Sequence, residues 1–272
     1  MIVITWVQPV IYTAFGIKVY SYGVCVAAAL GSCTLAMSRD LDRLGINAEA
    51  VLFMMCFIPG FWFGSKAQMV ISAFFSGEPM PSLGLETGHS FMGSAIGGVT
   101  TSALYGIWCG LSPARLVDLI APLVPLGHGI GKWGCFLSGD GCYGKKASPD
   151  LPWAMSFPNG MVPVREAVHP TPLYESILSL TLFAYLHFCL YIPAPGGRSL
   201  KVGRRTAVTL VLYGIERMLI EPYRRHPASE ALMGLTEYQF LAVVFVFVGL
   251  LLTVCIPRSS QWPLDPEKQK AA

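Results

Sequence analysis

The amino-acid sequence predicts an all-α integral membrane protein with about seven transmembrane helices and irregular extracytoplasmic segments around a central polar cavity. Of its 272 residues, 53% are hydrophobic and only 13% are charged, whereas a soluble globular domain has about 25% charged residues. The mean hydropathy is +0.54. The strict apolar–polar alternation of outer-membrane barrel strands is absent from the sequence. This composition excludes a soluble enzyme, a disordered chain and a nucleic-acid binder, for which a net charge of +3 is also too small.

Seven stretches of predominantly apolar residues are long enough to cross a bilayer as helices, which takes about 20 residues each. They lie at residues 17–37, 50–73, 91–111, 116–137, 173–192, 205–221 and 235–256. The sixth stretch has the weakest apolar pattern, because Glu216, Arg217 and Glu221 interrupt it. These seven stretches are the transmembrane helices that the sequence predicts.

The basic residues between these stretches predict the orientation in the membrane. Nine Lys and Arg residues lie in one set of loops, 38–49, 112–115, 193–204 and 257–272. Five lie in the opposite set, 1–16, 74–90, 138–172 and 222–234. Because cytoplasmic loops carry the excess of basic residues, the first set is predicted to be cytoplasmic. The amino terminus is then outside, the carboxyl terminus is inside, and the two largest non-helical segments face the outside.

The chain ends and the cysteines add further expectations. Residues 1–16 contain no Lys or Arg, so we interpret the first apolar stretch as a retained helix rather than a cleaved signal peptide. We expect residues 1–256 to form a single transmembrane domain and 257–272 to form a polar, disordered cytoplasmic tail. Cys135 and Cys142 have neither a paired His nor a CxxC pattern beside them, so their spacing predicts no metal site. The sequence gives no sign of another cofactor.

Ionisable residues in the apolar stretches drive the functional interpretation, because each costs about 2.5–3.5 kcal/mol on insertion and needs a partner or a polar cavity. The first such place is the segment 131–144, GKWGCFLSGDGCYG. Its five glycines would end a helix and let the backbone approach a ligand closely. Lys132 supplies a cation and Asp140 an anion. The alternative is a Gly-rich turn with a snorkelling lysine.

The second place is the segment 213–225, YGIERMLIEPYRR. Arg217, Glu221 and Arg224 are spaced i, i+4 and i+7, so they are predicted to share one helix face. Pro222 would kink or end the helix beside Glu221. A guanidinium matches a phosphate with two parallel hydrogen bonds, and a nearby carboxylate can orient it. The alternative is an ion pair with a purely structural role.

Two further places hold polar residues near the membrane surface. In His169–Glu175, Thr171 is predicted to cap a helix that has Pro172 at its first position. Tyr174 then falls in the first turn, and His169 is equally explained as a surface residue. Tyr22 early in the first helix is explained by an interfacial position, and His89 before the third helix by a loop position.

These segments resemble the prolipoprotein diacylglyceryl transferase family of bacterial membrane enzymes, over residues 8–252. The most specific part of the resemblance is the signature segment 131–144, with Asp118–Pro122 before it. His169–Glu175 is similar to the family's second block, and the segment from Tyr213 to Arg224 is similar to its third. The order of the blocks, the number of helices and the orientation agree with the family.

The resemblance implies a reaction between phosphatidylglycerol and the lipobox cysteine in the signal peptide of a prolipoprotein, in the bacterial inner membrane. The diacylglyceryl group passes to the thiol, a thioether forms, and glycerol phosphate leaves. Such chemistry needs a cation near the departing phosphate and a group that takes the thiol proton. The implied partners are therefore this lipid, the prolipoprotein and membrane lipids, with no nucleic acid and no cofactor.

The resemblance also implies roles for particular residues. Arg217 matches the family's essential arginine, which would hold the phosphate. The residues assigned to catalysis are Arg217, Glu221, Asp140 and His89. The residues assigned to lipid or phosphate binding are Tyr22, Lys132, Gly144, Arg224, His169 and Tyr174.

The sequence departs from the family pattern at several of these positions. Lys132 replaces a signature arginine, and a point charge cannot make the same bidentate contact. Cys135 and Ser138 replace the two signature asparagines. Met92 stands where the family has the histidine proposed as a base, so His89, one helical turn earlier, becomes the candidate if it points into the cavity.

Two other hypotheses for the function are compatible with the sequence. One is a lipid-head-group transferase with another acceptor. The other is a non-catalytic protein of the same fold that binds lipid or carries a solute, with structural ion pairs. A transporter would be expected to show internal repeats, and the sequence has none that stand out.

Overall fold

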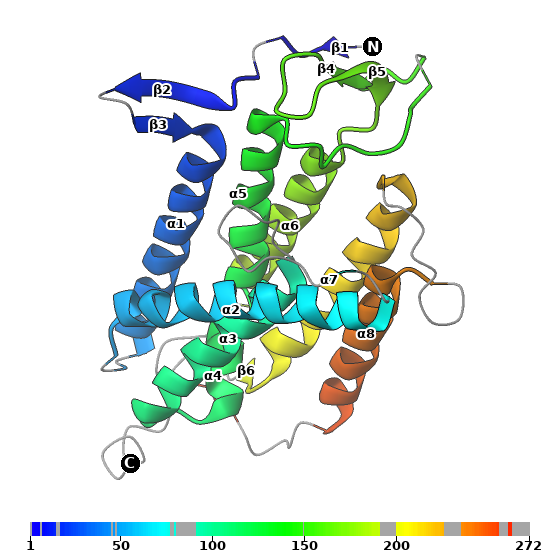
Figure 1. Ribbon diagram of the computed structural model, residues 1–272. Helices are drawn as coiled ribbons and strands as arrows, with labels where there is room; N and C mark the ends of the chain where they lie inside the picture. The colour runs from blue at the N-terminus through cyan, green and yellow to red at the C-terminus, as the bar shows by residue number, and fades with distance from the viewer. Residues whose placement is uncertain are drawn as a thin grey trace. The chain divides into compact units, whose positions relative to one another are not determined.

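The computed structural model describes residues 2–5, 7–14, 17–44, 46, 48–76, 79, 91–148, 150–190, 200–225, 235–255 and 261–262. Most of them are helical, as Figure 1 shows. The helices are α1 (Ser21–Leu44), α2 (Ala50–Ser76), α3 (Phe91–Trp108), α4 (Pro113–Ile120), α5 (Leu123–Ser138), α6 (Thr171–Phe188), α7 (Arg204–Ile220) and α8 (Glu237–Cys255). The predicted helical character is thus confirmed.

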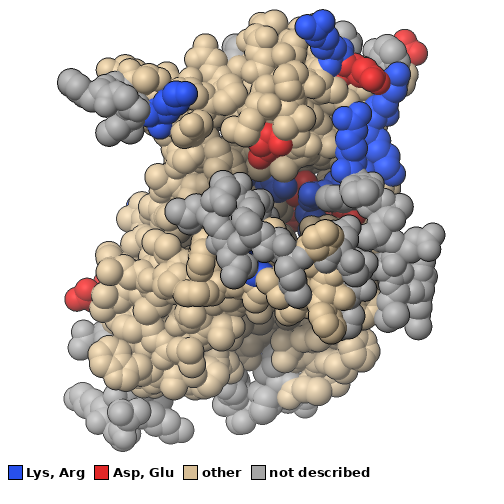
Figure 2. Space-filling model, in the orientation of Figure 1, with Lys and Arg blue, Asp and Glu red and all other residues tan. Residues whose placement is uncertain are grey.

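The apolar character of the helices agrees with a membrane protein. Among the described residues, three helices are long and apolar enough to cross a membrane: α1, α2 over Ala50–Phe74, and α8 over Tyr238–Cys255. Large apolar side chains on helices point outward, with Phe74 72% and Val254 83% exposed. Uncharged residues form most of the face in Figure 2. The count of seven spans stays a prediction.

Two of the predicted stretches differ from the helices observed. The stretch 116–137 is divided between α4 and α5, with the break at Ala121 and Pro122. Proline has no backbone N–H to donate to the carbonyl four residues earlier, so it interrupts the helical hydrogen bonds. The first stretch begins as a strand, because Ile17–Tyr20 (β3) pairs antiparallel with Val10–Ala14 (β2).

The segments 1–16 and 138–172, which were predicted to be extracytoplasmic and irregular, contain a small sheet, which corrects the all-α prediction. In it, Ile2–Val3 (β1) runs parallel to Met155–Phe157 (β4), and β4 pairs antiparallel with Val164–Val168 (β5). The predicted tail is also partly ordered: Gln261–Trp262 (β7) pairs with Leu200–Lys201 (β6). Such pairing satisfies backbone groups that a disordered segment would leave to water.

The chain divides into two compact units. The first contains Met1–Cys33, Pro125–Leu190 and Ala207–Val254, and the second contains Thr34–Val124, Tyr191–Thr206 and Cys255–Ala272. The proposed site residues other than His89 belong to the first unit. The single transmembrane domain over residues 1–256 stays a prediction.

In the first unit, α5 and α6 pack side by side below the sheet of β1, β4 and β5 (Figure 1). The Ser176 hydroxyl donates to the carbonyl of Gly129 at 2.8 Å. Above the helices, the ring of Tyr143 stacks on Phe157 with ring centroids 4.3 Å apart. Phe136 at the end of α5 joins the same buried cluster. These contacts attach the signature segment to both the sheet and the helices.

In the second unit, glycines let α2 and α3 approach each other closely. A Cβ atom on Gly97 would lie 2.9 Å from the Cα of Gly64 and closer still to the carbonyl oxygen of Gly60. Gly93 meets the carbonyl of Gly64 in the same way. Small residues spaced four apart allow this backbone contact between apolar helices, where van der Waals packing drives association.

The substitution Gly97→Ala is expected to destabilise the protein, because its methyl group has no room between the two helices. Overpacking of this kind costs about 1–3 kcal/mol. Gly31→Ala in α1 is the matched control, since no atom lies within 4 Å of its Cβ position, and alanine favours a helix by about 0.5–1 kcal/mol. Thermal unfolding in detergent should separate the two variants, and equal midpoints would contradict the glycine contact.

Candidate active site

The centre of the site is the carboxylate of Glu175, which is completely buried in the second turn of α6. Its Oε2 lies 2.9 Å from Lys132 Nζ and 2.9 Å from Arg217 Nη1. Arg224 Nη1 donates to Oε1 at 3.2 Å. His128 Nε2 lies 3.4 Å from Oε2. Three cations, one from α5 and two from the segment 213–225, therefore share one carboxylate.

Helical spacing places these groups. Lys132 lies four residues after His128 on α5, and Arg217 lies four after Tyr213 on α7, so each pair shares a helix face. Behind Glu175, the Ser179 hydroxyl donates to Glu216 Oε1 at 2.7 Å. This second layer joins α6 to α7 through a buried polar network, in which His128 Nδ1 lies 3.2 Å from the Tyr213 hydroxyl.

The cluster has spare capacity to bind an anion. The two carboxylates of Glu175 and Glu221 face three cations, and the buried Nε of Arg217 has no hydrogen-bond partner among the described residues. Glu221 Oε2 is 4.0 Å from Arg217 Nη2, and the Thr236 hydroxyl holds the other oxygen of Glu221 at 2.9 Å. The ring of Tyr238 lies beneath Arg217, with the guanidinium carbon 5.5 Å from its centroid.

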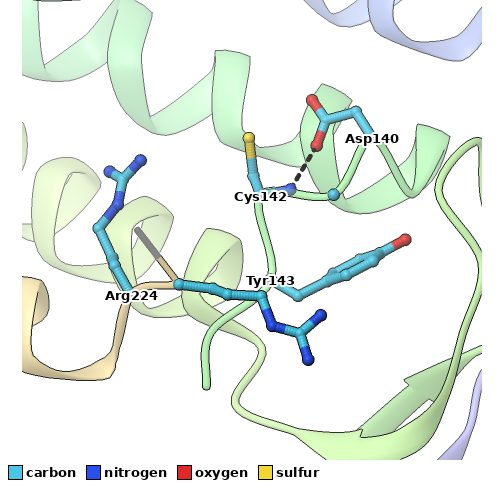
Figure 3. A pocket seen from close by; sticks show the side chains of 6 residues that line it. Asp140, Cys142, Tyr143 and Arg224 are labelled. Atoms are coloured by element: carbon cyan, nitrogen blue, oxygen red, sulfur yellow. Dashed lines mark hydrogen bonds between the residues drawn. The ribbon is translucent and has the colours of Figure 1, made fainter. Parts of the chain in front are cut away.

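A pocket of about 210 Å³ lies next to this cluster. It is lined by Asp140, Gly141, Cys142, Tyr143, Arg224 and Arg225. In Figure 3, Asp140 Oδ1 accepts the backbone N–H of Cys142, at 3.0 Å, and the Tyr143 ring points away from the Cys142 sulfur. Because Arg224 also contacts Glu175, it connects the pocket to the buried cations.

Two groups of this pocket lie outside the predicted membrane segments and have shifted pKa values. A hydrogen bond from the Cys135 thiol, helped by the charge of Lys132, lowers the pKa of the Cys142 thiol, although burial opposes this. Burial raises the pKa of the Tyr143 hydroxyl above its usual value. At neutral pH the Tyr143 phenol is therefore protonated, whereas Cys142 forms thiolate more readily than an ordinary cysteine.

The three sequence blocks meet at Gly144. Its N–H donates to the carbonyl of His169 at 2.8 Å, and a Cβ atom there would collide with the carbonyl of Tyr223. The Thr171 hydroxyl donates to the carbonyl of Cys142 at 2.7 Å. Thr171 is thus the first residue of α6 and holds the signature segment, instead of capping the helix as predicted. The missing side chain at Gly144 leaves room for the chain at Tyr223 and His169 to pass close to the signature segment.

The predicted shared face of Arg217, Glu221 and Arg224 is partly wrong. Helix α7 ends at Ile220, Glu221–Tyr223 form one 3₁₀ turn, and Arg224 is extended and bridged to Gly144. Pro222 cannot donate the hydrogen bond that would continue the helix. Arg224 nevertheless reaches Glu175, because the turn directs the chain back toward α6.

The remaining predicted residues are placed less centrally or not at all. Nδ1 of His169 lies 3.3 Å from the Tyr174 hydroxyl at the start of α6. Tyr22 is 44% exposed and packs against Gly134, whose added Cβ would lie 3.0 Å from its ring. His89 and the side chain of Met92 lie outside the described residues. The structure therefore gives no position for the predicted base.

Sequence reasoning missed the central role of Glu175 and did not consider His128. Both lie in apolar stretches that were predicted to cross the membrane, where any ionisable group is costly and needs a partner. That signal could have found them. The sequence pattern also gave no indication that the sulfur atoms of Cys135 and Cys142 and a carboxylate oxygen of Asp140 lie within 4.8 Å of one another.

The apolar helices and the buried cluster of cations define a membrane protein with a charged site among its helices. The family model for prolipoprotein diacylglyceryl transferase matches residues 9–255, and the chain belongs to this family. The phosphatidylglycerol–prolipoprotein diacylglyceryl transferase of Clostridium tetani is 28% identical over 249 residues, 90% of this chain and 96% of the relative. Those of Azoarcus sp. strain BH72 (33%) and Azospirillum brasilense (30%) cover 80% and 92% of this chain, and 82% and 89% of their own lengths.

The substitution Glu175→Gln is expected to destabilise the protein strongly, because it leaves the buried Lys132 and Arg217 and the half-buried Arg224 without the Glu175 carboxylate. Breaking a buried ion pair in this way costs about 3–5 kcal/mol. Glu166→Gln is the control: its surface pair with Lys146 at 3.1 Å is well exposed, and such pairs contribute about 0–1 kcal/mol. The comparison uses thermal unfolding followed by circular dichroism. Similar losses in both variants would show that the cluster does not hold the fold together.

Proposed function

We propose that this protein transfers the diacylglyceryl group of phosphatidylglycerol to the lipobox cysteine thiol of a prolipoprotein. A thioether forms and glycerol phosphate leaves. Membership of the family and the names of the relatives support this reaction. The observation that carries the proposal is the cluster in which Lys132, Arg217 and Arg224 surround the single carboxylate of Glu175.

The positive charge of the cluster is complementary to the negative charge that develops in this reaction. Negative charge accumulates on the departing phosphate, and cations that are already in place stabilise it without reorganising. Arg217 offers a planar fork that suits phosphate oxygens and an Nε–H that has no partner within the described part of the chain. Glu175 holds the three cations apart at fixed positions before substrate arrives. In the low dielectric of a membrane interior these interactions are stronger than in water.

The other assigned residues have supporting roles in this proposal. Glu221 orients Arg217 from 4.0 Å. His89 is the first candidate for the group that accepts the thiol proton. The remaining candidates are Glu221 and Asp140, which lines the pocket beside Arg224. Lipid or phosphate contacts are assigned to Tyr22, Lys132, Gly144, Arg224, His169 and Tyr174.

We place the protein in the bacterial cytoplasmic membrane with its amino terminus outside and its carboxyl terminus in the cytoplasm. The distribution of basic residues supports this orientation. In this proposal seven spans surround a central polar cavity, which admits the lipid from the bilayer and the signal peptide from the outer side. Membrane lipids surround the exposed apolar side chains, and the reaction involves no nucleic acid.

The substitution Arg217→Ala is expected to lower the rate of transfer by about 10²–10³-fold, the cost of removing one transition-state donor. Arg217→Lys should restore part of the rate, because it returns the charge without the bidentate fork. The assay follows radiolabelled diacylglycerol from phosphatidylglycerol to a lipobox peptide in membranes that contain each variant. Arg165→Ala, at an exposed arginine of β5, should transfer at the normal rate.

The alternatives give different results in the same assay. Lipid retained without any product would indicate a non-catalytic binding protein, and product on another acceptor would indicate a different transferase. Complementation of a strain depleted of its own transferase provides the cellular test. Failure to complement, with normal accumulation of the protein, would overturn the proposal.

A further inference from the structure

Two glycines bring three metal-ligating side chains together after α5. Gly139 and Gly141 have φ angles of +61° and +91°, a conformation that residues with a side chain rarely adopt. They turn the chain so that Asp140 and Cys142 return toward Cys135 in the last turn of α5. The two sulfur atoms and a carboxylate oxygen then lie within 4.8 Å of one another.

The backbone of this turn is held in place by its neighbours. Asp140 Oδ1 accepts the N–H of Cys142 at 3.0 Å, and the Thr171 hydroxyl donates to the Cys142 carbonyl at 2.7 Å. A hydrogen bond joins the thiols of Cys135 and Cys142. Cys135 is buried, and the other two side chains are half-buried. A donor set fixed at both ends of the loop is partly organised for a ligand.

The donors suit one metal ion best. Two thiols and one carboxylate favour a soft or borderline cation, and Zn²⁺ is commonly bound by such ligands in a tetrahedron. Zinc–sulfur bonds of about 2.3 Å place two sulfurs about 3.8 Å apart. The present separations of the three donor atoms are at most 4.8 Å, so side-chain rotations that shorten them by about 1 Å would give a zinc-binding geometry.

We propose that Cys135, Asp140 and Cys142 bind one Zn²⁺ ion and leave its fourth position open to the pocket. Asp140 and Cys142 both line that pocket, which has room beside them at about 210 Å³ (Figure 3). Three protein ligands with an open fourth position are typical of catalytic rather than structural zinc sites. Lys132, one turn before Cys135 on α5, offsets the surplus negative charge of two thiolates and one carboxylate.

The role of the site rests on the proposed function. The thiol of the acceptor cysteine occupies the fourth position, where coordination releases its proton to water. In the zinc-bound protein Asp140 therefore serves as a metal ligand and not as the base. The resulting sulfur attacks the glyceryl carbon that is joined to the phosphate oxygen. A carbon–sulfur bond forms, the carbon–oxygen bond breaks with its electron pair going to oxygen, and glycerol phosphate leaves. This activation compensates for Met92, which cannot take a proton.

Metal binding tests the site independently of transfer. The full chain is purified in detergent, reduced, freed of metal with a chelator, and titrated with Zn²⁺ or Co²⁺. We expect one ion per chain, with a thiolate-to-cobalt absorption band in the Co²⁺ form. Cys135→Ser and Cys142→Ser should each weaken binding by more than about tenfold, since even outer-shell changes around a metal cost this much. Cys189→Ser, at an exposed cysteine, should bind normally.

The possible results separate the two proposals. Less than stoichiometric zinc, an equal effect of Cys189→Ser, or a native Cys135–Cys142 disulfide whose reduced form binds no zinc would overturn the site. Full transfer by the metal-free protein would overturn the role of zinc and leave the proposed function intact. Zinc bound by the two cysteines without transfer to any lipobox peptide would support the site and contradict the proposed function.

Discussion

The buried carboxylate of Glu175 is the interaction on which the rest of the site depends. Lys132 comes from α5, whereas Arg217 and Arg224 come from α7 and the turn that follows it, and without this carboxylate their charges would repel one another. The same contact thus decides how α5, α6 and α7 pack and where positive charge is concentrated. Stability and anion binding have a common origin here, because the charges that the fold must neutralise are the charges that a phosphate would meet.

The departures from the family pattern become understandable in this arrangement. Lys132 makes one short contact to Glu175, which a point charge can do as well as an arginine. In the proposed reaction the planar recognition of a phosphate is assigned to Arg217 and Arg224. At Cys135 the change from asparagine is of another kind, because it introduces a sulfur beside Cys142. The signature segment has therefore kept its charge and changed its donor chemistry.

The sequence predicted much of the helical framework and only part of the site. Long apolar runs indicate helices because both buried and lipid-facing positions of a membrane helix require apolar side chains. Arg217 and Lys132 were recognised as site residues because a charge in such a run is costly. Spacing along one helix does not indicate which helices pack together. The central position of Glu175 among the cations could therefore be seen only in the structure. The approach of Cys135 to Cys142 depends on positive φ angles at Gly139 and Gly141, which a residue pattern does not reveal. The sheet escaped notice because its strands are only two to five residues long.

Gly144 shows that a sequence motif can combine residues that bind or react with substrate and residues that are small because neighbouring backbone leaves no room for a side chain. It contributes no charge, but the carbonyl of Tyr223 and the side chain of Thr171 leave no volume for a side chain there. The adjoining Arg224 owes its reach toward Glu175 to this contact. A larger residue at this position would therefore mimic the loss of an arginine in any screen scored by growth alone. Inactivity on substitution is thus no measure of proximity to the reacting atoms in this part of the chain.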